Sequence, residues 1–298
     1  MRVLVLGATG MLGHVLLERL HQGGRHDVRA TARAEDGLDR LLPRALREQV
    51  VPGVDAERIQ TVAAVLESFR PDVVVNCIGL VKQRPSAADP VAAISLNALF
   101  PHQLARLCAA VGGRLVHVST DCVFDGAAGK YTENDIPDAV DLYGRTKVLG
   151  ELAAADGITL RTSFIGHELR DRYGLVEWFL SQPGPVRGFT GAIFSGFPSV
   201  ELARIIDEHV LARIDMRGVY HVSSSPVSKC DLLRLIAGQY GHGIEIVPDD
   251  GCRIDRTLDS SRFREATGYE PPAWAELIGL MHAHFESSPC YRERGLQG

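Results

Sequence analysis

Short apolar runs alternate with amphipathic stretches along the first half of the chain. The runs are rich in valine and isoleucine, which suits buried strands of a parallel sheet. The stretches between them repeat apolar side chains at the spacing of one helical face. The predicted strands are residues 1–6, 28–32, 50–54, 72–78, 114–119 and 158–164. The predicted helices follow Gly13 and cover residues 56–69 and 92–111, with a mixed crossing segment at 33–47.

Strands that alternate with helices form parallel sheets with right-handed crossovers. We therefore predict a Rossmann-type, doubly wound α/β domain over residues 1–165. The rhythm changes after about Gly166, where proline and glycine interrupt the chain at 183–191. We predict that residues 166–298 form mainly a smaller α/β substrate-binding domain on the cleft side of the sheet. Its expected elements are helices at 200–213 and 229–240, strands at 218–223 and 244–248, and helical stretches near 261 and 273, with strand 218–223 a candidate to return to the main sheet.

A glycine-rich turn follows the first strand. It reads Gly7-Ala8-Thr9-Gly10-Met11-Leu12-Gly13 and opens an apolar helix. The first glycine permits a tight turn, the second a close approach of the backbone to a phosphate, and the third close packing of helix on sheet. The N-terminus of the helix then presents free N–H groups to an anion. The turn predicts a dinucleotide pyrophosphate site, and an ordinary strand–turn–helix is the alternative.

Two side chains at helical spacing suggest acid–base chemistry. Tyr143 and Lys147 are four residues apart, so a helix places them on one face. A nearby ammonium lowers the pKa of a phenol and makes it usable in proton transfer. Ser119 and Thr120 end a predicted strand, where open α/β sheets bind ligands. An isolated pair of this kind usually marks a surface helix, but together with the glycine turn it favours hydride chemistry on a carbonyl or an alcohol.

Composition narrows the class of protein. The chain has 298 residues, of which 45% are hydrophobic and 23% charged, and a net charge of −5, which suits a soluble globular enzyme. No basic stripe indicates nucleic acid, and no apolar run approaches the roughly 18 residues that span a bilayer. Six cysteines without a CxxC pair indicate reduced thiols and no metal site. Since a signal peptide is also lacking, we expect a cytoplasmic protein, either a monomer or a homodimer.

The end of the second strand bears on the choice of cofactor. The strand closes with Ala32 and Arg33, and no acidic residue precedes Glu35. An acid there would bind the ribose 2′-hydroxyl of NAD, whereas an arginine can pair with the 2′-phosphate of NADP. The sequence therefore favours NADP(H) and leaves NAD(H) open. A solvated surface arginine is the alternative interpretation of Arg33.

Several longer motifs carry a family resemblance. They are Val118 to Gly126 (VSTDCVFDG), Tyr131 to Asp135, Leu142 to Lys147 with Gly150 and Glu151, Leu160 to Ser163, Tyr220 to Val222, and Thr267 to Pro271. With the glycine turn, they resemble the extended short-chain dehydrogenases/reductases, and among these the dTDP-4-dehydrorhamnose reductase family of nucleotide-sugar reductases. Cys122 stands where these reductases usually have tyrosine and related dehydratases have a catalytic glutamate.

The resemblance implies roles for individual residues. Tyr143 would donate a proton to the C4 oxygen of the sugar, Lys147 would lower the pKa of Tyr143 and hold the nicotinamide ribose, and Thr120 would orient the carbonyl. The implied cofactor-binding residues are Gly7, Thr9, Gly10, Met11, Leu12, Gly13, Arg33, Asp55, Cys77, Ile78, Gly79, Asn97, Ser119, Tyr143 and Lys147. The implied substrate-binding residues are Thr120, Asp121, Cys122, Lys82, Arg187 and Arg256, with Arg253 a further candidate. A helix cap is an equally good interpretation of Asp55.

The implied activity is NADPH-dependent reduction of a nucleotide-linked 4-keto or 4-keto-6-deoxy sugar. Such a reaction serves the synthesis of deoxysugars or surface polysaccharides. Two alternatives stay open. One is a nucleotide-sugar epimerase with tightly bound NAD, and the other is a non-catalytic, NADP-binding regulatory subunit.

Pro101 lies inside the predicted helix 92–111. It has no N–H to offer the carbonyl of Asn97, so we expect a kink that frees this carbonyl. By resemblance, the freed carbonyl would bind a water on a path to Lys147. The alternative is a helix that simply starts near Phe100.

Overall fold

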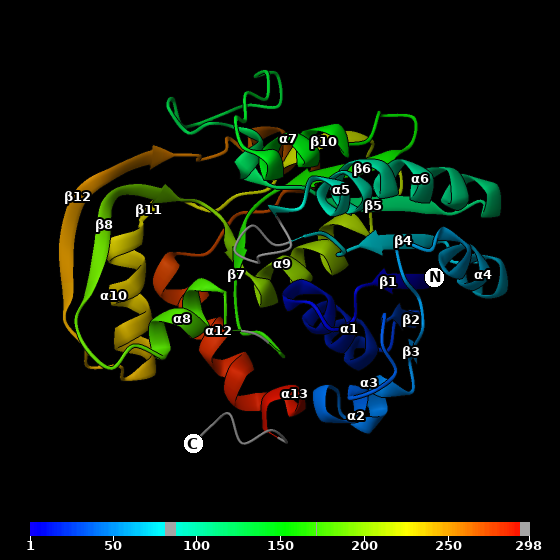
Figure 1. The fold of residues 1–298 in the computed structure, drawn as a ribbon, viewed down its shortest axis with the longest axis horizontal. Coiled ribbons are helices and arrows are strands. Elements are labelled where there is room, and N and C mark those ends of the chain that lie inside the picture. Colours follow the sequence, from blue (N-terminus) through cyan, green and yellow to red (C-terminus); the bar gives the residue numbers. More distant parts are fainter. Residues whose placement is uncertain (81–87, 171, 293–298) are drawn as a thin grey trace.

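A parallel sheet runs through the centre of the molecule in the computed structural model, which describes residues 1–80, 88–170 and 172–292 (Figure 1). Within these residues the sheet has seven strands in the order β10-β6-β5-β4-β1-β2-β3. The strands are β1 (Arg2–Leu6), β2 (Asp27–Thr31), β3 (Val50–Val51), β4 (Val73–Asn76), β5 (Arg114–Val118), β6 (Gly157–Arg161) and β10 (Gly218–His221). The reversal of strand order beside β1 is that of a doubly wound fold, which confirms the predicted fold class.

Alternating side chains of β1 divide the core into two layers. Val3 and Val5 face one layer, Leu4 and Leu6 face the other, and all four are fully buried. The first layer contains α1 (Met11–Gly23), α9 (Ser199–Ile205) and α12 (Trp274–Ser287), and the second contains α4 (Ile59–Phe69) and α6 (Phe100–Val111). A central strand buried on both faces explains why its sequence is a continuous apolar run.

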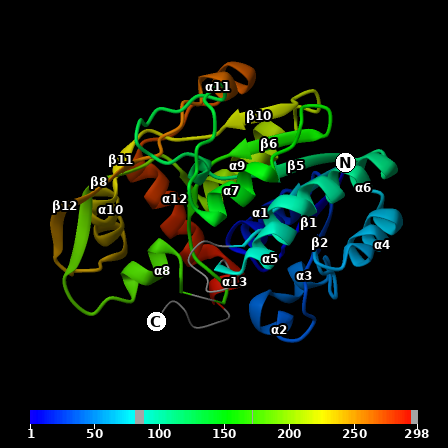
Figure 2. The same cartoon turned by 45° about the horizontal axis from the view of Figure 1, so that its top comes forward.

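The second half of the chain contributes to the main sheet. β10 pairs in parallel with β6, so the expected return of strand 218–223 is confirmed (Figure 2). α9 and the π-helical segment η4 (Ile206–Val210) replace the single helix expected at 200–213, and α9 packs on α1. Division of the chain into domains at residue 165 stays a prediction.

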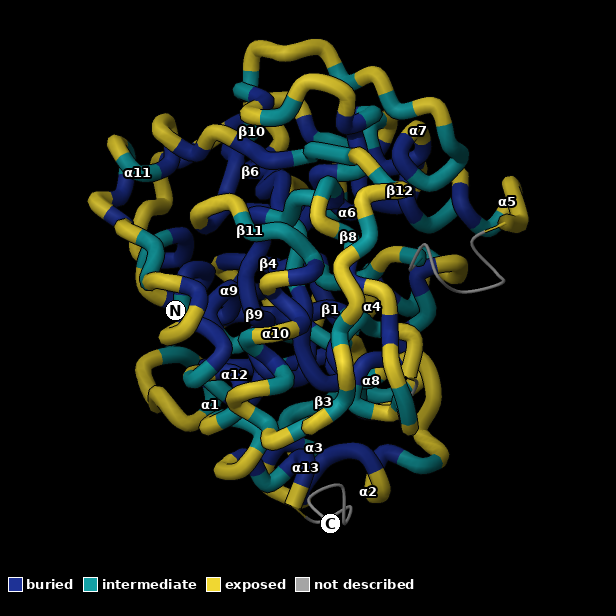
Figure 3. The backbone as a smooth tube through the Cα atoms, turned by 90° about the vertical axis from the view of Figure 1, so that its left-hand side faces the viewer, coloured by how far each residue is buried: buried dark blue, intermediate teal, exposed yellow. Residues whose placement is uncertain are grey.

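A smaller sheet lies to one side of the main sheet. Its strands are β8 (Val186–Phe194), β11 (Val227–Ser228) and β12 (Ile246–Asp255), in the order β11-β8-β12. α10 (Lys229–Tyr240) packs on β8 and has the predicted bounds, and α8 (Leu175–Leu180) lies nearby. We call this smaller sheet the outer ribbon. Its strand β12 consists of exposed and half-buried residues, whereas the central strands β4 and β5 of the main sheet are buried (Figure 3).

Strand β8 corrects an expectation from the sequence. Two of its glycines fall within residues 183–191, where the frequent prolines and glycines predicted interruptions of regular structure and no strand. A Cβ on Gly188 would lie 2.8 Å from Ile246 Cγ2 and 2.9 Å from Cys230 Sγ, and one on Gly191 would lie 2.8 Å from the Cys252 carbonyl oxygen. These glycines therefore permit close packing within a strand rather than a turn.

The remaining elements differ modestly from expectation. β3 has only two residues because Pro52 cannot donate to the ladder, and β12 continues well past the predicted 244–248. Besides α8, β8 and β11, further elements that the sequence did not predict are the helices α2 (Leu38–Leu41), α3 (Arg44–Arg47) and α13 (Pro289–Arg292), and the paired strands β7 (Phe164–Ile165) and β9 (Phe197–Pro198). α11 (Ser261–Thr267) and α12 confirm the two late helical stretches. No helix among the described residues is long and apolar enough to cross a membrane.

The helix around Pro101 is irregular but unbroken. α5 (Pro90–Ala93), the π-helical turn η2 (Ile94–Leu99) and α6 follow one another directly. The N–H of Phe100 donates to the carbonyl of Ser95, five residues earlier. The helix is thus continuous and does not begin anew at Phe100. A π-helical turn lets it pass Pro101, which has no N–H to donate. The carbonyl of Asn97 lies against Gly150 just after α7 (Leu142–Leu149), and the water link to Lys147 stays a prediction.

This contact makes Gly150 sensitive to substitution. Its backbone is right-handed helical, so alanine is conformationally acceptable there, but a Cβ would lie 1.9 Å from Asn97 O. We expect Gly150→Ala to lower the free energy of unfolding by about 1–3 kcal/mol, as overpacking does, in a urea titration. Gly238→Ala is the matched control, because no atom lies within 4 Å of that Cβ and the residue is inside α10. The control should stabilise the protein by up to roughly 1 kcal/mol through helix propensity. Equal stability of Gly150→Ala and the native protein would contradict the tight contact.

Candidate active site

The glycine turn after β1 has the geometry of an anion site. Gly7 has a φ of +92°, and its carbonyl accepts the N–H of Gly10 at 3.0 Å. A Cβ on Gly13 would lie 2.0 Å from Gly7 O, so only glycine lets α1 pack this closely on the turn. Gly10 begins α1 without a side-chain cap, which leaves the N–H groups of the first turn, from Met11 onward, for a ligand. The turn fits a dinucleotide pyrophosphate.

Helix α7 brings the predicted proton donor to the end of β5. The carboxylate of Asp141 caps the helix and accepts the N–H of Gly144 at 2.7 Å. The Lys147 ammonium donates to the carbonyl of Val118, the last residue of β5, at 2.9 Å. The hydroxyl of Thr120, two residues further along, lies near the Tyr143 side chain and acts to lower its pKa. The structure thus gathers Thr120, Tyr143 and Lys147 as the sequence predicted, at the carboxyl edge of the sheet.

Burial sets the protonation of both helix residues. It raises the pKa of Tyr143 above its ordinary value, and the neighbouring Cys122 and Asp121 act in the same direction. Burial lowers the pKa of Lys147 to about 8, while the charge of Glu151 opposes this shift. The expected lowering of the Tyr143 pKa by Lys147 stays a prediction.

Ser119 is held by a buried ion pair. Glu151 and Arg161 pair at 2.7 Å, and their side chains are only 9% and 5% exposed. The Ser119 hydroxyl donates to Glu151 Oε1 at 2.9 Å. The side chain of Ser119 is thus used to fix the end of β5, and its predicted contact with the cofactor stays a prediction.

The same arginine connects to a second buried layer. Arg161 donates to His221 Nε2 at 3.2 Å and lies over the ring of Phe124, 5.3 Å from its centroid. The Phe124 ring stacks on Tyr131 at 4.1 Å, and His221 Nδ1 is bonded to the carbonyl of Tyr131. This layer supports the segment that carries Thr120. The sequence motifs contained all of these residues but gave no sign that they touch.

Two buried asparagines fix the loop after β4. Asn76 Oδ1 accepts the N–H of Ile78 at 3.0 Å, and Asn97 Oδ1 accepts the N–H of Leu80 at 3.0 Å. The Asn97 amide also donates to Thr146 Oγ1 on α7 at 3.3 Å. The predicted cofactor residues Cys77, Ile78 and Gly79 lie on this loop. The side chain of Asn97, which sequence reasoning had overlooked in favour of its carbonyl, therefore joins the loop to the catalytic helix.

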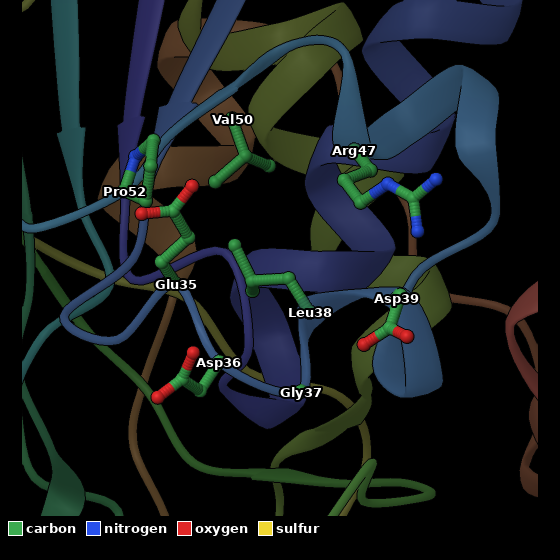
Figure 4. Close-up of a pocket in the computed structure, with 8 residues that line it drawn as sticks. All are labelled: Glu35, Asp36, Gly37, Leu38, Asp39, Arg47, Val50 and Pro52. Atoms are coloured by element: carbon green, nitrogen blue, oxygen red, sulfur yellow. The ribbon is translucent and has the colours of Figure 1, made fainter.

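The residues expected to bind the adenosine half of the cofactor, Arg33 and Asp55, lie just after β2 and β3. Arg33 is exposed there, and Asp55 Oδ1 accepts the N–H of Glu57 at 3.1 Å, as in a local turn. A cavity of about 470 Å³ lies beside them (Figure 4). Its lining residues are Glu35, Asp36, Gly37, Leu38, Asp39, Arg47, Val50 and Pro52. Three carboxylates thus accompany one arginine, and Arg33 does not line this cavity.

The predicted substrate residues fall into two groups. Arg256 reaches the site, since its Nε donates to the carbonyl of Phe124 at 2.7 Å and its charge acts on Asp121. Arg187 lies on the outer ribbon and is paired with Asp249 at 3.2 Å, and Arg253 is exposed on β12. Lys82 lies outside the described residues. Geometry therefore favours the residues near Thr120, which also include Asp121 and Cys122.

Comparison with known proteins assigns the family. Residues 1–286 match the family model described as the RmlD substrate binding domain. The chain belongs to this family. It is thus an extended short-chain dehydrogenase/reductase, from a family of NAD(P)-dependent oxidoreductases.

The relatives of this RmlD-family chain differ in how much of its length they match. The dTDP-4-dehydrorhamnose reductase of Aggregatibacter actinomycetemcomitans is 25% identical, over 96% of this chain and 99% of that protein. Mouse methionine adenosyltransferase 2 subunit beta is 36% identical over 157 residues, which are 52% of this chain but only 43% of that protein. The chain therefore spans less than half of that relative. The structure of Bacillus anthracis dTDP-4-dehydrorhamnose reductase in complex with NADP has the same fold, with a TM-score of 0.77 and 21% identity over 95% of this chain and 99% of that one.

Buried histidines predict sensitivity to acid. Burial, reinforced by the Arg161 charge, lowers the pKa of His221 to about 4, and burial lowers the pKa of His14 to about 4. An unfolded histidine has a pKa near 6.5. As the pH falls from about 6.5 to 4, the unfolded chain therefore takes up these protons first and stability is lost, by roughly 3 kcal/mol per histidine. Urea unfolding at pH 7.5 and 5.0 should show this loss, and His221→Gln should reduce it. An unchanged loss in the variant would exclude His221 as a source.

Proposed function

We propose that the protein reduces a nucleotide-linked 4-keto sugar, using NADPH as the hydride donor and Tyr143 as the proton donor. The observation that carries this proposal is the meeting of Thr120, Tyr143 and Lys147 on the sheet edge where the glycine turn also lies. Membership of the RmlD family and full-length similarity to a dTDP-4-dehydrorhamnose reductase support the substrate class. The reaction would serve deoxysugar or surface-polysaccharide synthesis.

The protein's own groups would supply binding and the proton. When bound, the dinucleotide supplies the hydride. Thr120 donates a hydrogen bond to the substrate carbonyl oxygen, and Tyr143 gives its hydroxyl proton to the alkoxide that develops there. Because the pKa of Tyr143 is raised, the phenol is protonated at neutral pH and the donor is ready before the substrate binds. Lys147 holds the nicotinamide ribose.

The predicted cofactor residues would divide along the sheet edge. The pyrophosphate would lie on the N-terminus of α1, at Gly7, Thr9, Gly10, Met11, Leu12 and Gly13. The loop of Cys77, Ile78 and Gly79, with Asn97 and Ser119, would border the nicotinamide half, and Asp55 and Arg33 the adenosine half. Arg33 supports NADP(H), whereas the carboxylates of the neighbouring cavity favour NAD(H).

Arg256 is our candidate for the diphosphate of the substrate. Its guanidinium lies beside the Thr120 segment, where the transferred groups must meet, and is half-buried. Arg187 is a weaker candidate because Asp249 already neutralises it. Asp121 and Cys122 would face the sugar from the same segment as Thr120.

A second candidate function is that of a regulatory subunit. It is favoured by the 36% identity with methionine adenosyltransferase 2 subunit beta over 157 residues. A protein with this role would bind NADPH yet oxidise none of it with any nucleotide 4-keto sugar. An epimerase would instead retain oxidised nucleotide through gel filtration and consume none. A panel of such sugars, followed by NADPH absorbance, separates the three functions.

The proton donor is tested by Tyr143→Phe. This change removes the hydroxyl but keeps the ring, so it should lower kcat by about 10² or more and barely change NADPH affinity. NADPH oxidation gives the rate, and quenching of protein fluorescence gives the dissociation constant. Near-normal turnover in this variant would refute the assignment.

The cofactor preference is tested by Arg33→Ala. If Arg33 pairs with the 2′-phosphate, the variant should bind NADPH more weakly by about 1–3 kcal/mol and NADH with unchanged affinity. Calorimetric titration with both nucleotides measures the difference. Arg29→Ala serves as the control, because Arg29 lies on β2, just before Arg33, and is bonded to Gln49. Equal losses for both nucleotides would contradict the role of Arg33.

A further inference from the structure

A buried histidine lies directly behind the glycine turn. His14 belongs to the first turn of α1, and its side chain is 0% exposed. Its ring nitrogen Nδ1 lies 2.7 Å from the carbonyl oxygen of Gly10, and its backbone N–H donates to the same oxygen at 3.2 Å. The side chain and the backbone of His14 therefore both fix the carbonyl of the residue that begins the helix.

The direction of the hydrogen bonds through this ring follows from its chemistry. A carbonyl oxygen only accepts, so Nδ1 of His14 must carry a proton. Burial lowers the pKa of His14 to about 4, so the ring is neutral at neutral pH and its other nitrogen, Nε2, accepts. The hydroxyl of Tyr291 lies 2.7 Å from Nε2 and therefore donates to it. A chain of two hydrogen bonds thus leads from Tyr291 through His14 to the carbonyl of Gly10.

Helix α1 itself holds the segment that carries Tyr291. This tyrosine lies in α13 and is 1% exposed. The hydroxyl of Ser288, just before α13, donates to Glu18 Oε2 at 2.7 Å, and the same carboxylate oxygen lies 3.2 Å from Nε2 of His284 on α12. Glu18 follows His14 by one helical turn. The C-terminal segment is therefore bound to two successive turns of the helix that begins at the glycine turn.

The bond to Gly10 also fixes the N–H of the next residue. The peptide bond between Gly10 and Met11 is trans, so its C=O and N–H point in opposite directions. Bonds that draw the carbonyl toward the body of α1 therefore aim the N–H of Met11 out of the helix N-terminus, where an anion would bind. A carbonyl that accepts two hydrogen bonds also makes its own peptide N–H a stronger donor.

We propose that His14, held by Tyr291, is a positioning residue for the dinucleotide. It fixes the Gly10 peptide so that the N–H of Met11 is already aimed at the pyrophosphate before the nucleotide binds, which lowers the ordering cost of binding. His14 acts through this peptide, because its side chain is buried behind the turn. The inference rests on the proposed function, in which the glycine turn binds the pyrophosphate, and it adds the C-terminal segment to the cofactor site.

The first test observes the ring of His14 in the native protein. A proton–nitrogen correlation spectrum of the histidine side chains at pH 7.5 distinguishes a protonated ring nitrogen from an unprotonated one, and the signals missing in His14→Asn identify His14. We expect Nδ1 to carry the proton and Nε2 to be unprotonated. Protonation at Nε2 would overturn the proposal, because Nδ1 then could not donate to Gly10, or Tyr291 could not donate to the ring.

The second test compares two amides at position 14. Asparagine places its nitrogen as many bonds from the backbone as Nδ1, so His14→Asn can still donate to Gly10, but it leaves the phenol of Tyr291 unpaired. Glutamine places its amide where Nε2 was, so His14→Gln keeps a partner for Tyr291 and loses the donor to Gly10. Calorimetric titration should show NADPH affinity within about twofold of native in His14→Asn and about three- to tenfold weaker in His14→Gln, as on loss of one hydrogen bond. If affinity instead follows the free energy of unfolding, with the less stable variant binding more weakly, His14 serves folding alone and the proposal is overturned.

The third test removes only the hydroxyl of the C-terminal tyrosine. Tyr291→Phe should weaken NADPH binding by about two- to fivefold in the native background and by no further amount in His14→Asn, where the donor to Gly10 no longer depends on the phenol. Tyr240→Phe is the matched control. Tyr240 is also bonded to a histidine, His167 Nε2 at 2.9 Å, but that ring lies outside α1 and the glycine turn. The control should keep native affinity for NADPH, and an equal loss in both tyrosine variants would contradict the proposal.

These outcomes can be told apart from failure of the proposed function. If the native protein binds neither NADPH nor NADH, the reductase proposal fails together with this inference, before any variant is compared. If the native protein binds NADPH and the two amide variants at position 14 bind it equally well, only the role of His14 fails.

Discussion

The buried ion pair of Glu151 and Arg161 is the interaction on which the catalytic end of the sheet depends. It joins three parts of the chain: the end of β6 through Arg161, the segment after α7 through Glu151, and the end of β5 through Ser119. A buried pair is costly unless its remaining hydrogen-bonding groups are satisfied. Here His221 and the Phe124 ring complete the surroundings of the guanidinium. The pair therefore fixes these three parts of the chain relative to one another. One helical turn before Glu151, Lys147 is fixed to the end of β5 by its hydrogen bond to the carbonyl of Val118.

The sequence predicted the main sheet well because its strands are buried on both faces. Such strands are continuous apolar runs, and the helices between them have one apolar stripe, so both periods are visible without tertiary information. The outer ribbon was predicted poorly for the opposite reason. In β8 the glycines meet Ile246 and Cys252, residues more than fifty positions away, and no local pattern distinguishes such a contact from a turn.

The candidate site shows the same division. The residues with chemistry of their own, Thr120, Tyr143 and Lys147, could be named from motif and spacing because the reaction requires those side chains. The supporting residues could not, because their role is a contact. Asn97 was expected to act through the carbonyl that Pro101 frees, yet its amide side chain bonds the loop after β4 to α7. Arg187 and Arg256 were equivalent as arginines of the second half, and only the fold places one of them beside Phe124.

Two glycines in the segment from Tyr143 to Glu151 set the distance between helix α7 and the segments that it packs against. A Cβ on Gly144 would lie 2.4 Å from the carbonyl oxygen of Cys122, and one on Gly150 would lie 1.9 Å from that of Asn97. Helix α7 thus packs backbone to backbone against the Thr120 segment at one end and against η2 at the other. Larger residues at either position would push the helix away from β5. The approach of Tyr143 to Thr120 and the hydrogen bond from Lys147 to Val118 both require that closeness. The spacing glycines are therefore as necessary to the site as the residues that carry the proton.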